Sequence, residues 1–318
     1  MEHFIKNKFS IGLNLDTSFE TYSRFIETYH PYLSSIYYSM PWGKKYYSRE
    51  ALEEELTQEH IEEKLSNILN LLKKYQIRRE LTFNMKGLTT ADIDYAIEQT
   101  YAFGIIPEEI VSLKEYGSQL RHAFPDAELK YSFNNTDYEQ IPDIFDTVVV
   151  GKHFLRDQNA RHELIRKGFQ LVLLLNNGCS FNCHGFCGDR DFCHSFVKKN
   201  LERYTANELY AMQSFFPFEL KRLLAEDPCA NDYRYKISNR PLGLDYTIKA
   251  LSSYLSGADV ESLIQEDIIN YSLFGVMYTL GLYCNEFDYQ KIVRIKKKLS
   301  VSYKEYYNRE HQTGCMYL

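Results

Sequence analysis

The sequence lacks the signals that mark a membrane or exported protein. Its longest strictly aliphatic run, Leu171 to Leu175, is far shorter than the roughly 20 apolar residues that a membrane-spanning helix needs. The first residues show no continuous apolar segment followed by small residues, as an export signal would. We therefore expect a soluble, cytoplasmic protein.

An excess of positive charge is absent as well. The 318 residues include 37 Lys and Arg against 43 Asp and Glu, which gives a net charge of −6. This balance argues against a nucleic-acid-binding surface that extends over the whole protein. A local basic run, Arg294 with Lys296 to Lys298, is more simply explained as the solvated face of a helix. The content of 44% hydrophobic and 25% charged residues excludes a disordered chain or a coiled-coil rod.

Familiar catalytic and nucleotide-binding motifs are missing too. No GxGxxG occurs, which removes the main support for a dinucleotide-binding fold. There is no GxSxG nucleophile elbow and no P-loop. His162 and Glu163 begin the zinc-protease pattern HExxH, but Arg166 stands where the second histidine belongs. We interpret this match as chance.

What is present is an alternation of short apolar runs with amphipathic segments. Eight runs are typical of strands and cover residues 9–15, 33–40, 79–85, 109–113, 129–133, 145–150, 169–175 and 233–237. Helical patterns separate most of them, and Thr89 with Asp92 forms a capping-box-like start to one helix, which we expect to end at Gly104. Repeated strand–helix units predict a parallel sheet.

Eight such units over about 240 residues favour a TIM-like (β/α)8 barrel over an open doubly wound sheet. We assign residues 1–241 to the barrel. Residues 242–318 are helical in pattern, and we expect them to pack on its outside as a C-terminal extension. No Pro- or Ser-rich linker separates the two parts.

The cysteines carry the clearest chemical signal. There are seven, and four of them fall in a cysteine-rich loop at 178–194 that directly follows the most apolar strand. These four are Cys179, Cys183, Cys187 and Cys193, spaced C-x3-C-x3-C-x5-C. In a barrel, this loop would belong to the carboxyl edge, where active sites lie. In a reducing compartment, such clustering indicates metal or redox chemistry rather than disulfides.

Three interpretations of the cysteine cluster remain open. We favour a 4Fe-4S cluster, because four thiolates suit its four irons and the gaps are wider than in zinc knuckles. Zinc is the alternative, although its usual CxxC pairs are absent. The third possibility is that no metal binds. Cys229 lies shortly before the last strand and is kept as a substitute ligand, on the expectation that it reaches the same edge.

Polar residues also fall near the predicted carboxyl ends of strands. They are Asn84, Lys86, Ser132, Asn134, Lys152, His153, Asn176, Lys236 and Arg240. We expect Lys236 and Arg240 to hold a carboxylate or phosphate, since arginine suits a bidentate pair. His153 is a candidate general acid or base. The competing interpretation is that each basic residue pairs with a loop carboxylate and that the histidine is structural.

Two blocks of the chain resemble the collagenase-like peptidase family U-32. In the block VVVGKHFLRDQNARHELIRKGFQLVLLLNNGCSFNC, the matching residues are Asn176, Gly178, Cys179 and Cys183. In the block FPFELKRLLAEDPCANDYRYKISNR, they are Pro217, Glu219, Leu220, Lys236, Ile237 and Arg240. The similarity covers about residues 9 to 275.

The resemblance implies a TIM-like barrel with a cysteine-ligated 4Fe-4S cluster. Relatives in that family assist the oxygen-independent hydroxylation of a quinone precursor or of RNA bases. The chain departs from the family pattern in two ways. All four candidate ligands lie in one loop, whereas relatives often draw some from farther along, and Asn239 replaces the usual glycine of the last strand motif.

We thus expect an iron–sulfur enzyme or its cluster-bearing subunit. It would perform a redox or hydroxylation-type modification of a small-molecule, peptide-borne or RNA-borne substrate, with a protein partner or electron donor. The alternative is a zinc-stabilised binding or scaffold protein. A peptidase ranks last, because no nucleophile and base pair is visible.

Overall fold

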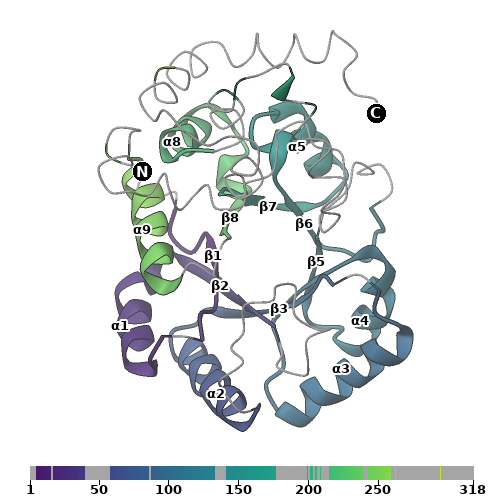
Figure 1. Cartoon of the computed structure of the whole chain (residues 1–318). Coiled ribbons are helices and arrows are strands. Elements are labelled where there is room, and N and C mark those ends of the chain that lie inside the picture. Colours follow the sequence, from purple (N-terminus) through teal and green to yellow (C-terminus); the bar gives the residue numbers. More distant parts are fainter. Residues whose placement is uncertain are drawn as a thin grey trace.

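Eight parallel strands form a closed barrel in this computed structural model (Figure 1). The structure describes residues 5–15, 17–39, 58–85, 87–132, 141–176, 215–238 and 243–258, together with 199, 201–202, 205, 208, 262 and 294. Each strand pairs with the next one along the chain, and the eighth pairs back with the first. The predicted TIM-like barrel is confirmed.

The eight strands agree with the predicted runs; most are shorter, and β3 and β5 each begin one residue earlier than predicted. They are β1 Phe9–Gly12, β2 Leu33–Tyr38, β3 Arg78–Phe83, β4 Glu109–Ser112, β5 Glu128–Ser132, β6 Thr147–Val150, β7 Gln170–Leu174 and β8 Arg234–Ile237. The α-helices around them are α1 Phe19–Tyr29, α2 Gln58–Lys74, α3 Thr90–Phe103, α4 Gly117–Ala123, α5 Gln158–Arg166, α8 Pro217–Glu226 and α9 Gly243–Ser256. Short 3-10 turns are η2 His30–Tyr32, η4 Lys114–Tyr116, η6 Lys152–Leu155 and η7 Ala230–Asp232.

Side-chain caps mark the starts of several helices, among them the start predicted at Thr89. The Thr89 side chain accepts a hydrogen bond from the backbone of Asp92, and the Asp92 carboxylate accepts one from the backbone of Thr89. This capping box satisfies two amide groups that the first turn of α3 leaves unpaired. Gly104 ends α3 in a left-handed conformation with φ 75°, which glycine adopts without steric cost. Asp157 caps α5, because its carboxylate accepts a hydrogen bond from the backbone of Ala160 at 3.0 Å.

The outer face of the barrel is apolar and covered by the helices. Side chains that alternate along the strands, such as Ile11, Ile36, Leu81, Ile110 and Val148, are almost fully buried in the hydrophobic core. The ring of helices buries this face, as expected for a parallel sheet. In the described part of the chain, no helix is long and apolar enough to cross a membrane.

Helix α9 packs against α8 and β8, so the ring of helices continues past residue 241 (Figure 1). It is the first helix of the expected C-terminal extension. From residue 259 onward, that extension lies outside the described residues apart from Ser262 and Arg294.

Candidate functional site

The interior of the barrel holds charged side chains rather than the branched apolar layers that usually fill it. Several ion pairs join residues of strands that are not neighbours, such as β3 with β8 and β4 with β8, and these pairs cross the interior. The participating residues are Arg78, Glu80, Glu109, Glu128, Lys130, Arg234 and Lys236. We call this set the interior network.

The interior network runs from one edge of the barrel to the other. At the amino edge, the half-exposed Arg78 contacts Glu109 and Glu128, each at 2.7 Å. In the middle, Lys130 pairs with Glu109 and lies 2.6 Å from Glu80. Toward the carboxyl edge, Glu80 also pairs with Lys236. The network therefore extends through the interior from Arg78 at the amino edge to Lys236 near the carboxyl edge.

Ion pairing lowers the pKa of two of the buried carboxylates, whereas burial raises the pKa of Glu109. Burial would raise the pKa of Glu80, but the charges of Lys130 and Lys236 outweigh it and hold the pKa far below its ordinary value. Burial acts against Glu128 in the same way, yet its hydrogen bond from Arg234 and the charge of Lys130 lower the pKa to about 2. The interior network is therefore ionised at neutral pH at these two positions.

Lys236 is the member of the network nearest the carboxyl edge. Its ammonium lies over the Tyr37 ring, 3.9 Å from the ring centroid, and Tyr37 donates a hydrogen bond to the carbonyl of Ile237 at 2.9 Å. Burial lowers the pKa of Lys236, while Glu80 acts in the opposite direction. In the described part of the chain, Lys236 pairs with one carboxylate, whereas Lys130 pairs with two. The partner of Lys236 lies on strand β3 rather than on a loop.

Asn176 fixes the point from which the cysteine-rich loop departs. Its amide nitrogen donates to the Ser238 carbonyl at 3.0 Å and to the Tyr246 hydroxyl at 2.8 Å. Its side-chain oxygen accepts from the backbone and hydroxyl of Ser238. These bonds join the carboxyl ends of β7 and β8. Asn176, the last described residue before the cysteine-rich loop, therefore lies at the carboxyl edge, just after the strand next to that of Lys236.

The structure places the other predicted site residues as follows. Asn84 and Ser132 lie at the carboxyl ends of β3 and β5, as predicted. Lys152 and His153 belong to η6, directly after β6, but their side chains lie outside the described part of the structure. The remaining residues that lie outside the described part are Lys86, Asn134, Arg240, Cys179, Cys183, Cys187 and Cys193.

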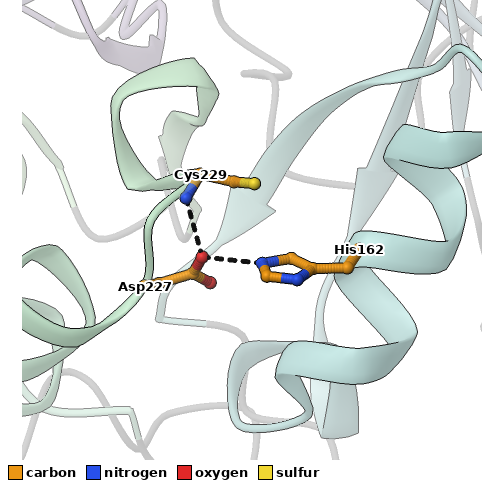
Figure 2. A group of neighbouring side chains, drawn as sticks. All are labelled: His162, Asp227 and Cys229. Atoms are coloured by element: carbon orange, nitrogen blue, oxygen red, sulfur yellow. Dashed lines mark hydrogen bonds and ion pairs between the residues drawn. The ribbon is translucent and has the colours of Figure 1, made fainter.

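Cys229 does not lie at the carboxyl edge, which corrects the expectation that it reaches the cysteine-rich loop from there. It precedes η7 and the amino end of β8, and the strands of the barrel are parallel. Its position is therefore at the opposite edge from Asn176. Cys229 instead neighbours Asp227 and the α5 residue His162 (Figure 2).

Sequence reasoning missed both the interior network and this second cluster. A signal for the network exists in the alternation of polar residues along single strands, such as Arg78, Glu80 and Thr82 in β3. Polar residues at a spacing of two share one face of a strand. No comparable signal links His162 with Asp227, because they are 65 positions apart in different elements.

Comparison with known proteins does not assign the chain to a family. No protein-family model matches the chain, and no curated protein matches it. Among solved structures, RipC from Yersinia pestis shares 10% identity with a TM-score of 0.33, covering 78% of this chain and 94% of that one. A GH113 beta-1,4-mannanase shares 9% identity with a TM-score of 0.41, covering 73% of this chain and 88% of that one. Similarity at this level gives no information about function. The assignment to the barrel class rests on the pairing of the eight strands.

Proposed function

We propose that the chain is an iron–sulfur protein whose active site is the carboxyl edge of the barrel. In this proposal, Cys179, Cys183, Cys187 and Cys193 hold a 4Fe-4S cluster. One observation supports the proposal: Asn176, two residues before the cysteine-rich loop, is bonded to the end of the strand that bears Lys236. In the sequence, the dense set of thiols follows this point, which lies at the edge where barrel enzymes have their sites.

The donor set fits such a cluster. Four cysteines within fifteen residues offer one thiolate for each iron, and free thiols of this kind require a reducing compartment such as the cytoplasm. The resemblance to peptidase family U-32 supports the same ligands. When bound, the cluster would supply one-electron transfer at this edge.

The protein's own residues would bind and orient an anionic substrate. Lys236 would contact a carboxylate or phosphate group from the floor of the site, because its ammonium has one carboxylate partner in the described part of the chain. Glu80 and the Tyr37 ring hold that ammonium in place. Arg240 would add a bidentate contact, and His153 would exchange a proton with the substrate. The substrate class is an anionic small molecule or an anionic group on a peptide or RNA, with a separate electron donor.

Anaerobic purification with iron, sulfide and zinc analysis tests the cluster. We expect brown protein with about four irons and four sulfides per chain, as a single 4Fe-4S cluster requires. Single Cys→Ala changes at the four loop positions should each lower the iron content, while Cys315→Ala should not. Colourless protein that carries zinc at the loop, or iron that survives all four changes, would overturn the proposal.

Titration with inorganic phosphate tests Lys236. We expect Lys236→Met to weaken phosphate binding at least tenfold, because the ammonium at the floor of the edge is lost. Lys167→Met is the matched control, since Lys167 sits on the half-exposed end of α5 in a 3.4 Å pair with Glu163. Equal phosphate binding by Lys236→Met and the unaltered chain would remove Lys236 from the site.

A further inference from the structure

Three side chains with metal-binding atoms converge outside the barrel, between α5 and the segment that leads into β8. They are His162 from α5, Asp227 from the end of α8, and Cys229 from the turn before η7 (Figure 2). A ring nitrogen, a carboxylate oxygen and the thiol sulfur all lie within 4.8 Å of one another. The proposed cluster and the interior network use none of these groups.

The two carboxylate oxygens of Asp227 have different surroundings. Oδ2 accepts hydrogen bonds from Arg161, at 2.5 Å from Nη2 and 3.1 Å from Nε, and from the Tyr233 hydroxyl at 2.9 Å. Oδ1 faces the other way, 2.9 Å from His162 Nε2 and 3.0 Å from the backbone nitrogen of Cys229. One oxygen is thus anchored by buried partners, and the other points at the two remaining ligands.

This arrangement is the one that metal sites use to orient a carboxylate. A ligating side chain is commonly fixed by outer hydrogen bonds, which set its direction before the ion arrives. Arg161 and Asp227 are both almost fully buried, with side-chain exposures of 4% and 3%. His162 and Cys229 are only partly buried, so an ion can enter from their side.

We propose that His162 Nε2, Asp227 Oδ1 and Cys229 Sγ form a binding site for one zinc-class divalent cation, with water as the fourth ligand. One imidazole, one carboxylate and one thiolate are a ligand set that zinc accepts, and three protein ligands leave a fourth position open. The site goes beyond the proposed function, because it lies outside the barrel and at the amino end of β8.

The spacing of the three atoms suits this ion after a small adjustment. Bonds of about 2.0 to 2.3 Å in tetrahedral geometry separate ligand atoms by about 3.3 to 3.7 Å. The 2.9 Å between Nε2 and Oδ1 is slightly less, and the 4.8 Å limit for the whole group is about 1 Å more. Rotation of the Cys229 side chain, which is not held by a disulfide, closes that difference.

Binding would exchange protons for the ion in a balanced way. Burial and the carboxylates of Asp227 and Asp232 raise the pKa of the Cys229 thiol, so the metal-free sulfur is protonated at neutral pH. The incoming cation takes the place of the thiol proton, and the imidazole binds through Nε2 while its proton resides on Nδ1. The carboxylate and thiolate then balance the two charges of the ion.

Protection of Cys229 from alkylation tests the site without interference from the other six cysteines. Full-length protein, first treated with a chelator, is reacted with iodoacetamide with and without Zn²⁺, and each cysteine is followed by peptide mapping. We expect Zn²⁺ to slow the modification of Cys229 at least tenfold in the unaltered chain, and less than twofold in His162→Gln. His122→Gln, which changes an exposed histidine of α4, is the matched control and should keep full protection.

Cobalt spectroscopy provides a second readout on the same proteins. Co²⁺ should give a thiolate charge-transfer band that decreases by one equivalent in Cys229→Ser and in His162→Gln, but not in Cys315→Ser. Zinc that leaves Cys229 fully reactive, or protects it equally in His162→Gln, would overturn the proposal, as would identical cobalt spectra in all variants. Iron and sulfide content is independent of these variants, so failure here is distinguishable from failure of the proposed function.

Discussion

The interior network and the cluster around Asp227 both bury charge, but they satisfy it differently. Inside the barrel, carboxylates and cations pair with one another across strands β3, β4, β5 and β8. Around Asp227, one carboxylate oxygen is committed to Arg161 and Tyr233, while the other faces two potential metal ligands. In the first arrangement, each charged group has a partner of opposite charge, and in the second, one carboxylate oxygen faces side chains that can bind an ion.

The difference indicates what each region contributes. In a set of buried ion pairs, the attraction between the members must offset the desolvation of each charge. The loss of one member therefore leaves the charge of another uncompensated. Such a network stabilises one register of the barrel. In the cluster around Asp227, His162 and Cys229 are only partly buried, so their desolvation costs less. These side chains can exchange one partner for another, which suits reversible binding of an ion.

Glu80→Gln should produce the largest loss of stability. The substitution leaves the buried ammonium of Lys236 without its carboxylate, and breaking a buried pair in this way costs about 3 to 5 kcal/mol. Urea unfolding followed by circular dichroism measures the change. Glu20→Gln is the control: Glu20 pairs with Arg24 on the exposed face of α1 and should cost less than about 0.5 kcal/mol. Similar values for the two variants would contradict the view that the interior network supports the fold.

Glu128 should make the stability of the barrel sensitive to acid. Its pKa of about 2 in the folded state is lower than the roughly 4.3 of an unperturbed glutamate. Because the folded pKa is depressed, the stabilisation is complete above pH 4.3 and is lost as the pH falls toward 2. By linkage, the contribution at neutral pH is about 3 kcal/mol.

The measurement is the free energy of unfolding between pH 6 and pH 2.5 for the unaltered chain and for Glu128→Gln. The variant should start lower and fall less steeply, whereas Glu163→Gln, in a half-exposed pair, should follow the unaltered chain. A parallel slope for Glu128→Gln would show that the network does not dominate acid sensitivity.

Asp227→Asn should cost less than the interior change. The amide oxygen can still accept one bond from Arg161, so the buried guanidinium loses charge compensation but keeps a partner. We expect a loss of about 2 kcal/mol, in the range for a hydrogen bond to a charged group. Asp232→Asn, on the exposed side of η7, is the control for thermal or urea unfolding. If Asp227→Asn lost as much stability as Glu80→Gln, the interior network and the cluster around Asp227 would not differ in their contribution to stability.

These contrasts also explain how much could be predicted from the sequence. The strands and caps depend on neighbours in sequence: Thr89 meets Asp92 three positions away, and the apolar outer face repeats every second residue. The interior network depends on closure of the barrel, which brings Glu80 to Lys236 across 156 positions. The polar alternation was visible, but which carboxylate meets which cation follows from the register between distant strands. The cysteine-rich loop remains a prediction from composition and spacing.

Tyr233→Phe tests whether the Tyr233 hydroxyl orients the Asp227 carboxylate for an ion or contributes only to the stability of the fold. The Tyr233 hydroxyl donates to Asp227 Oδ2, which is not the carboxylate oxygen proposed to bind the ion. Its removal should cost about 2 kcal/mol of stability, because the acceptor is a charged carboxylate. If the hydroxyl also orients the carboxylate for the ion, Zn²⁺ affinity should fall about tenfold or more, as outer-shell changes do at metal sites.

Tyr235→Phe is the matched control. Tyr235 lies two positions after Tyr233 in the sequence, and its hydroxyl donates to the Ala230 carbonyl at 3.2 Å rather than to Asp227. Both tyrosines are fully buried, so the two variants remove the same group from similar surroundings. The comparison is made by urea unfolding without metal and by the Zn²⁺ concentration that half-protects Cys229 from alkylation. A loss of stability in both variants, with weaker zinc binding only in Tyr233→Phe, would establish that the bonds on Oδ2 orient Asp227 for an ion. Equal zinc binding in both variants would mean that the bonds on Oδ2 serve the packing of α5 against β8 alone.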